Sequence, residues 1–179
     1  MKLRAFLITV CAALVSGCAT NLPPHAFLPQ SVTIAERPIV DNAVGEVKVT
    51  TAATNVGEHI SAENFQVALI EVIKRSNIFG SDTSKSVRIE AHVYDASLPN
   101  AGFTMKSRLG VHYRVIASDG QVLLDRDVFY EGKATTGEEF FGSARAIKAF
   151  QSANQGHFTL FLGALKEAIQ EFKGKERTP

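Results

Sequence analysis

Between Leu109 and Glu131 the chain alternates apolar and polar residues on both sides of one turn signal, Ser118-Asp119-Gly120-Gln121. Alternation with a period of two is typical of a half-buried β-strand. Asp-Gly favours a two-residue hairpin loop in which both central residues have positive φ. This segment therefore predicts an antiparallel hairpin whose loop is Asp119 and Gly120.

A loop at Asp119 and Gly120 fixes the register in which the two strands pair. The residue pairs on the two faces of the hairpin provide independent checks of this register. One face receives apolar pairs: Val115 opposite Leu124, Val111 opposite Val128, and Leu109 opposite Tyr130. The other face receives charge pairs: Arg114 opposite Asp125, His112 opposite Asp127, and Arg108 opposite Glu131. A slip of one residue would turn the side chains of one strand to the wrong face. The agreement of both faces favours this register.

Two strands and a helix are expected before the hairpin. Val44–Ala53 and Val87–Ala96 alternate as half-buried strands do. Between them, Ser61 is a plausible N-cap for a helix that runs to about Ser76. Its apolar residues recur at helical spacing and form one stripe: Phe65, Leu69, Val72 and Ile73.

The chain after the hairpin is expected to be helical. Thr136 and Glu139 fit a capping box. The apolar residues farther on form a helical stripe: Phe158, Phe161, Leu162, Leu165, Ile169 and Phe172. Asn154-Gln155-Gly156 is expected to kink or interrupt this helix. The order β-α-β-β-β-α predicts an α+β domain of two layers, a mostly antiparallel sheet of about four strands with two helices on one face.

The first residues have the layout of a secretory signal peptide. Lys2 and Arg4 precede an apolar run, Ala5–Val15, and two small residues follow it. The run is shorter than the ~20 residues that a membrane-spanning helix needs. The chain is thus expected to divide into a removed signal (1–17), a proline-containing tether (18–30), a single domain (31–174) and a disordered tail (175–179).

The end of this segment, Val15-Ser16-Gly17-Cys18, resembles the lipobox of bacterial lipoproteins. The resemblance implies cleavage between Gly17 and Cys18, and lipid attachment to Cys18 by acyl groups such as palmitate. Ala19 follows where an Asp tends to retain such proteins on the inner membrane, so the outer membrane of a Gram-negative cell, periplasmic face, is expected. The alternative is an ordinary signal peptide that contains a Cys near its end.

Composition excludes several classes of function. Without residues 1–17 the chain keeps 17 Lys and Arg against 18 Asp and Glu, a net charge of −1. This balance excludes a protein that binds nucleic acid or an acidic membrane mainly through net charge. Cys11 would leave with the signal and Cys18 would carry lipid, so thiol catalysis and disulfides are not expected.

The remaining candidates for chemistry favour structural interpretations. His92 and His112 share the polar face of neighbouring strands, which makes a two-His site geometrically possible, but metal sites usually need three or four ligands. Asp125 and Asp127 each face a basic residue, which suits a structural ladder better than a proton shuttle. We expect that the protein binds no metal or other cofactor and that it is not an enzyme.

One stripe of basic residues is a candidate binding surface: Lys106, Arg108, His112 and Arg114. The stripe could dock phosphate groups of lipopolysaccharide, a glycan or an acidic partner, although the acidic strand beside it cancels most of its field. The phenylalanine-rich C-terminal helix is interpreted as core rather than as a lipid-binding face.

The order of elements after the lipobox resembles small outer-membrane lipoproteins of the YajG type. It is more distantly similar to LptE and to auxiliary lipoproteins of ABC transport systems. This resemblance is architectural, and folds do not fix functions. It implies a non-catalytic, membrane-tethered binding or assembly module with an envelope protein as partner. The alternative is an accessory lipoprotein for lipid or lipopolysaccharide transport.

Overall fold

The computed structural model describes residues 28–29, 32, 35–52, 61–99 and 101–176. The expected signal, Gly17, Cys18 and the tether up to residue 27 lie outside the described residues. The elements follow in the order β1 (Val40–Thr51), α2 (Ala62–Ser76), β2 (Phe79–Ser97), β3 (Thr104–Ile116), β4 (Val122–Thr135) and α3 (Gly142–Glu176).

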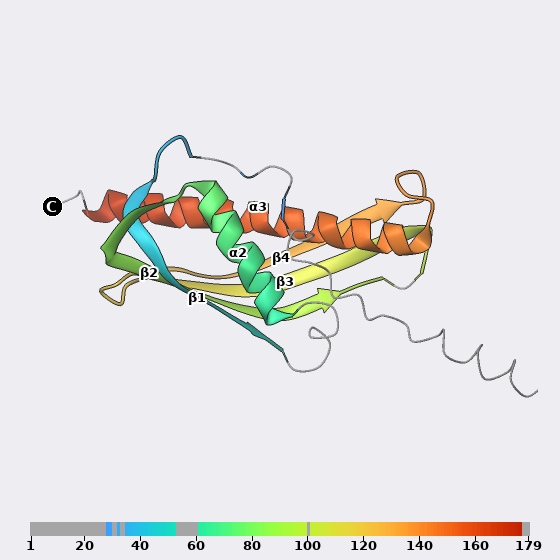
Figure 1. Cartoon of the computed structure of the whole chain (residues 1–179), viewed down its shortest axis with the longest axis horizontal. Helices are drawn as coiled ribbons and strands as arrows, with labels where there is room; N and C mark the ends of the chain where they lie inside the picture. The colour runs from blue at the N-terminus through green and yellow to red at the C-terminus, as the bar shows by residue number, and fades with distance from the viewer. Residues whose placement is uncertain (1–27, 30–31, 33–34, 53–60, 100, 177–179) are drawn as a thin grey trace, which may run out of the picture.

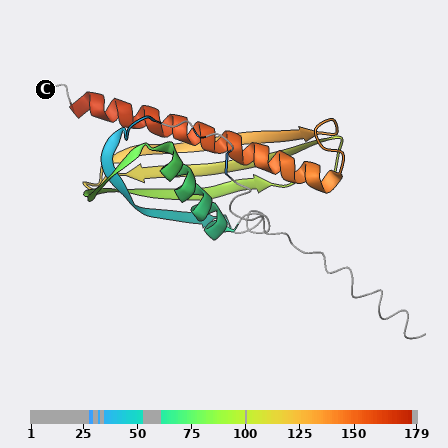
Figure 2. The ribbon, with the colours of Figure 1, turned by 45° about the horizontal axis from the view of Figure 1, so that its top comes forward.

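The strands form one four-stranded sheet in the order β1-β2-β3-β4. β1 runs parallel to β2, because α2 carries the chain back between them, and the other two pairs are antiparallel. Both helices lie on the same face of the sheet, α2 over β1 and β2, α3 over β3 and β4 (Figures 1 and 2). The predicted two-layer α+β fold is confirmed.

The core lies between the sheet and the two helices. Phe65 of α2 stacks on Phe158 of α3 with ring centroids 5.4 Å apart. Tyr113 of β3 stacks on Phe161 of α3 at 4.0 Å. The predicted stripe of α3 is buried from Phe158 to Ile169, so the interpretation of these phenylalanines as core is confirmed.

α2 begins and ends where the sequence predicts. Ser61 is the N-cap, and its Oγ accepts a hydrogen bond from the Asn64 backbone N–H at 3.0 Å. Asn77 ends the helix in the left-handed conformation (φ 52°). The Asn77 side-chain amide also donates to the Ala35 carbonyl at 3.0 Å. This contact ties the segment before β1 to the end of α2.

The body of the β3–β4 hairpin has the predicted register, but its loop is different. The Ala117 N–H donates to the Gln121 carbonyl at 2.8 Å, so the loop has three residues, Ser118 to Gly120. Gly120 has positive φ (88°) and Asp119 does not. Asp-Gly also suits this three-residue loop, a turn followed by a left-handed Gly. A register shift between Val115 and Ile116 compensates for the extra loop residue and restores the predicted pairs.

The two local predictions for the last helix are wrong. α3 is continuous from Gly142 to Glu176, because Asn154-Gln155-Gly156 serves packing rather than termination. The Asn154 amide donates to the Phe150 carbonyl at 2.9 Å, and the lack of a Cβ at Gly156 makes room for the ring of Tyr130. The capping motif lies one residue earlier, where Glu138 accepts from the N–H and hydroxyl of Thr135 at 2.9 Å each. It closes a separate turn before the helix.

Candidate functional site

The sheet has one face that neither helix covers, and we call it the open sheet face. Strand pairing aligns two rows of side chains across this face, four strands wide. One row is Thr50, His92, His112 and Asp127, and the other is Lys48, Glu90, Arg114 and Asp125. The second row alternates in charge from strand to strand.

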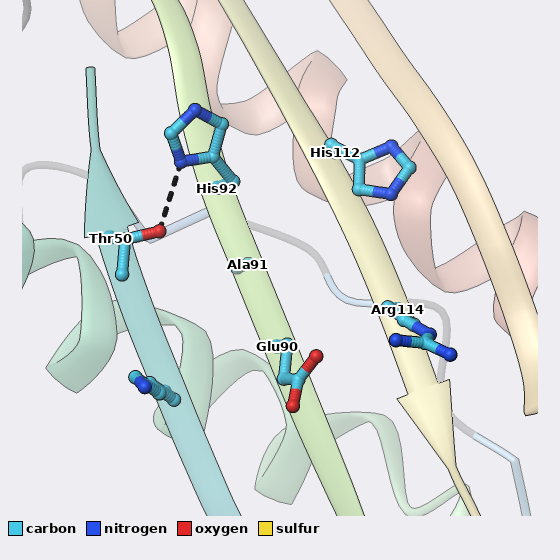
Figure 3. A pocket seen from close by; sticks show the side chains of 7 residues that line it. Thr50, Glu90, Ala91, His92, His112 and Arg114 are labelled. Atoms are coloured by element: carbon cyan, nitrogen blue, oxygen red, sulfur yellow. Dashed lines mark hydrogen bonds between the residues drawn. The ribbon is translucent and has the colours of Figure 1, made fainter.

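A shallow groove of about 420 Å³ runs along these rows. Its lining residues come from β1, β2 and β3: Lys48, Thr50, Glu90, Ala91, His92, His112 and Arg114 (Figure 3). The Thr50 hydroxyl and His92 Nδ1 lie 2.9 Å apart and share a hydrogen bond. The parallel pairing of β1 with β2 thus adds Lys48 and Thr50 to a polar face that the sequence assigned to the hairpin and to the strand of His92. Lys48 and Thr50 could have been predicted only from the order of the strands in the sheet, which the sequence does not give.

His112 lies between two carboxylates of the neighbouring strand. Its Nε2 is 3.1 Å from Asp125 and its Nδ1 is 2.9 Å from Asp127. Arg114 Nε lies 3.7 Å from Asp125. The predicted pairs of His112 with Asp127 and of Arg114 with Asp125 are confirmed. The side chains are 41–68% exposed, so each pair contributes no more than about 1 kcal/mol to stability.

The third predicted pair keeps its register but exchanges its ion-pair partners. Arg108 is aligned with Glu131, yet its Nε lies 3.6 Å from Asp95. Glu131 contacts Lys106 instead, at 2.8 Å. The cause is a register shift in β2 between Val93 and Asp95, which turns Asp95 to the open sheet face. The sequence carries a signal for this irregularity, because strict alternation from Val93 would place the charged Asp95 on the apolar side.

Tyr94 is a further residue of the open sheet face that sequence reasoning did not single out. Its ring lies over Gly110 of β3, where a Cβ would approach within 2.6 Å of Tyr94 Cε2. Burial, and then the carboxylates of Asp127 and Asp95, raise the pKa of the Tyr94 hydroxyl. The glycine inside a strand was the available signal, because such glycines mark close approach of another group.

His92 and His112 bond different partners and do not point at a shared metal position. They are aligned across β2 and β3, but His92 bonds Thr50 and His112 bonds the two aspartates. Within the described ranges, no group of three or more His, Cys, Asp or Glu residues could hold a metal ion. The same part of the chain contains no helix that is long and apolar enough to cross a bilayer.

A second polar contact lies in the core and not on the surface. The Tyr113 hydroxyl and His157 Nε2 share a hydrogen bond of 3.0 Å, and both residues are fully buried. Burial lowers the pKa of His157 to about 3 and raises the pKa of Tyr113. Both groups are therefore neutral near pH 7. Neither lines the groove, so the pair is a structural contact.

Comparisons with known proteins identify the fold. No protein-family model and no curated protein matches the chain. Protein XCC0632 from Xanthomonas campestris, of family DUF330, has a similar structure with 13% identity and a TM-score of 0.59, covering 80% of this chain and 95% of that one. At this identity the likeness shows a shared fold.

Two weaker structural matches have TM-scores below one half. A candidate lipoprotein from Caulobacter crescentus is 12% identical with a TM-score of 0.41, covering 72% of this chain and 91% of that one. The PelC dodecamer from Paraburkholderia phytofirmans is 12% identical with a TM-score of 0.46, covering 75% of this chain and 93% of that one.

Proposed function

We propose that this chain is a non-catalytic binding or assembly module of the Gram-negative cell envelope. Acyl groups on Cys18 hold it on the periplasmic face of the outer membrane, and its open sheet face docks an envelope protein. The sequence Val15-Ser16-Gly17-Cys18 supports the anchor, and Ala19 favours the outer membrane. The observation that carries the binding role is the open sheet face, a charged sheet surface that both helices leave uncovered.

The pattern of charges on this face suits recognition of a polar protein surface. Lys48, Glu90, Arg114 and Asp125 alternate in sign across the four strands. A partner that presents the opposite alternation gains electrostatic complementarity, whereas a uniformly charged polymer meets as much repulsion as attraction. The partner is thus expected to be a protein with both charge signs and not a nucleic acid.

The same arrangement argues against catalysis. The carboxylates of the face lie against basic side chains: Asp125 contacts both His112 and Arg114, and Glu90 lies 3.1 Å from Arg88. Acid–base catalysts need a proton-transfer group aimed at a bound reactant. The groove that these residues line is wide and shallow, and it does not enclose a small molecule as ligand pockets do.

Photo-crosslinking in the native cell tests the docking role. A photoreactive residue replaces the exposed Thr50 in the groove, and a matched control replaces Val67, which is 54% exposed on α2. We expect one discrete crosslinked protein from position 50 and none from position 67. The absence of a product at position 50, or identical products from both positions, would contradict docking through the open sheet face.

A second groove favours the alternative function, an accessory role in lipid or lipopolysaccharide transport. It has a volume of about 300 Å³ between β1 and α2 and is mostly apolar: Ala43, Val44, Gly45, Val47, Ile70, Ile73, Lys74, Phe79 and Gly80. This volume is at the lower end for ligand sites and could take part of an acyl chain, with Lys74 near an acidic headgroup. Lipid that solvent extracts from the native protein, and that Ile70→Trp removes, would support this role. The covalent acyl groups of Cys18 resist that extraction.

A further inference from the structure

Three phenylalanines protrude from one end of the molecule, and we call this group the phenylalanine tip. Phe103 is 85% exposed, Phe140 is 82% exposed and Phe141 is 70% exposed. Phe103 lies in the loop between β2 and β3, and the other two lie in the loop between β4 and α3. Both loops are at the same end of the sheet (Figures 1 and 2). Exposed apolar clusters of this kind mark sites of protein or membrane contact.

A buried arginine holds the two loops together. Arg145, at the start of α3, is only 7% exposed. Its Nη1 donates to the carbonyls of Glu139 at 2.9 Å and Phe140 at 3.1 Å, and its Nη2 donates to the Gly102 carbonyl at 2.8 Å. The Thr136 N–H also donates to the Phe103 carbonyl at 3.1 Å. The loops are thus built to display the rings, which lowers the entropic cost of inserting them into an apolar phase.

Two lysines lie beside the tip, together with Glu138 and Glu139 of the same loop. Lys148 Nζ lies 3.4 Å from the Glu138 carbonyl oxygen. Hydrogen bonds from Thr135, with smaller contributions from Lys148 and Lys133, lower the pKa of the Glu138 carboxyl. Both lysines therefore lie near the base of the tip, where ammonium groups can contact lipid phosphates while apolar side chains enter the acyl region. Phenylalanine has no polar atom that must stay in water during this insertion.

The length of the tether favours a membrane over another apolar surface. Ten residue steps separate Cys18 from Leu28, and Leu28 packs against the core. An extended chain of that length spans at most ~36 Å, which is less than the ~52 Å length of the 35-residue α3. A lipid on Cys18 would keep the bilayer surface within that distance of Leu28. The bilayer is then the apolar surface that is always available to the tip.

We propose that the phenylalanine tip inserts into the bilayer surface and sets the orientation of the domain on its lipid anchor. This proposal rests on the proposed acylation of Cys18. It makes membrane attachment two-point: one covalent contact at the start of the tether and one non-covalent contact at the end of the sheet. The open sheet face is then held in one orientation toward its partner.

Tryptophan fluorescence tests the insertion, because the chain has no Trp of its own. The full-length protein is purified from membranes and reconstituted into vesicles of phosphatidylethanolamine and phosphatidylglycerol, with or without bromine on the acyl chains. Phe140→Trp reports on the tip. Phe129→Trp is the matched control, since Phe129 lies in the middle of β4 and is 49% exposed.

We expect the emission of the Phe140→Trp variant to shift to shorter wavelength in vesicles and to be quenched by brominated lipid. The emission of the Phe129→Trp variant should show neither change. Water-like emission from the tip, or equal quenching of both variants, would overturn the proposal. The first of these results would mean that the tip contacts a protein or stays in water.

The intact mass of the same samples separates this inference from the proposed function. An acylated chain whose tip is not quenched leaves the anchor in place and removes the insertion. An unacylated chain whose tip is quenched removes the anchor and leaves the insertion in place. Phe141→Trp provides a second reporter on the same loop, with an exposed fraction of 70%, and it should behave as Phe140→Trp does.

Discussion

Tyr113 and His157 place one polar contact inside an apolar core. In the unfolded chain His157 titrates near its ordinary pKa of 6.5, whereas in the folded chain burial lowers that pKa to about 3. The unfolded state therefore binds a proton that the folded state does not bind between these two values. Stability must fall as the pH falls through that range, by up to about 1.4 kcal/mol per pH unit for this one group.

The pH dependence of unfolding tests this linkage. We expect the free energy of unfolding of the native chain to decrease from about pH 6.5 to about pH 4, in excess of the loss shown by a His157→Gln variant. Glutamine can still bond the Tyr113 hydroxyl but does not titrate. Urea unfolding of both proteins across the pH range measures the difference. Parallel profiles for the two proteins would mean that His157 is protonated in the fold or accessible to water.

Gly132 is a residue of β4 at which the backbone of α3 lies directly against the sheet. A Cβ there would lie 2.6 Å from the Ala149 carbonyl oxygen and from Ala153 Cα, both of which belong to the backbone of α3. The helix cannot move away locally because its neighbouring turns are also packed on the sheet. Gly163 lies in the same helix, and nothing lies within 4 Å of a Cβ built on it.

These two glycines make a matched pair of substitutions. Gly132→Ala should destabilise the protein by several kcal/mol, in the upper range for overpacking. Gly163→Ala should stabilise it by roughly 0.5–1 kcal/mol, because alanine is the better helix former and meets no neighbour. Thermal unfolding of each variant gives the sign. A stable Gly132→Ala protein would show that α3 is not seated on β4 at this point.

The hairpin of β3 and β4 is the element that the sequence predicts best. Its two faces constrain the register independently, and the alternative registers each bury charge. The loop was harder to predict because Asp-Gly suits both two-residue and three-residue hairpin loops. The glycine at position 156 inside α3 makes room for the ring of Tyr130, which approaches from another element. Local sequence cannot show such a contact.

Part of the candidate site could be predicted because it lies within one hairpin. Arg114, His112, Asp125 and Asp127 belong to one hairpin, so alternation alone places them together. Lys48 and Thr50 join them only through the sheet order, which the sequence leaves open. The phenylalanine tip depends on tertiary contacts made by Arg145, and no periodic pattern marks it.

Exchange of the charges at Arg114 and Asp125 tests two things: the register of the hairpin and the binding of a partner to its charged face. Arg114→Asp puts a carboxylate opposite both Asp125 and Glu90, and each like-charge pair costs ~0.2–1 kcal/mol. The double variant Arg114→Asp with Asp125→Arg should recover about half of the loss, because repulsion from Glu90 remains. Chemical unfolding of the single and double variants measures this recovery.

The same double variant separates a docking surface from a solvated one. A partner reads the position of charges rather than their pairing, so the folded double variant should lose the crosslink expected from Thr50. Arg75→Glu with Glu71→Arg is the matched control, since that exposed pair lies within α2 at 2.8 Å. If the double variant at the hairpin keeps its crosslink unchanged, then the charge pattern of the open sheet face does not select the partner.

The fold and the proposed anchor together imply a domain that works at a membrane surface. The described chain starts at Leu28 with contacts to the core, so the residues between Cys18 and this point set how far the domain can move. A long linker would let the domain leave the surface, whereas ten residues would keep Leu28 within ~36 Å of an anchor at Cys18. Attachment at Cys18 is therefore the premise on which the two-point attachment of the domain depends.

Cys18→Ser tests that premise directly. The variant should remain an uncleaved precursor in the inner membrane and take up no radioactive palmitate, because the thiol is the acceptor of the first acyl-bearing group. Cys11→Ser is the matched control: this cysteine lies inside the apolar run of the signal, so the variant should be cleaved and labelled like the native chain. Palmitate labelling of the Cys18→Ser protein would contradict the lipoprotein assignment. Cleavage without labelling of the native chain would instead identify an ordinary signal peptide, and the phenylalanine tip would then be the remaining candidate for membrane contact.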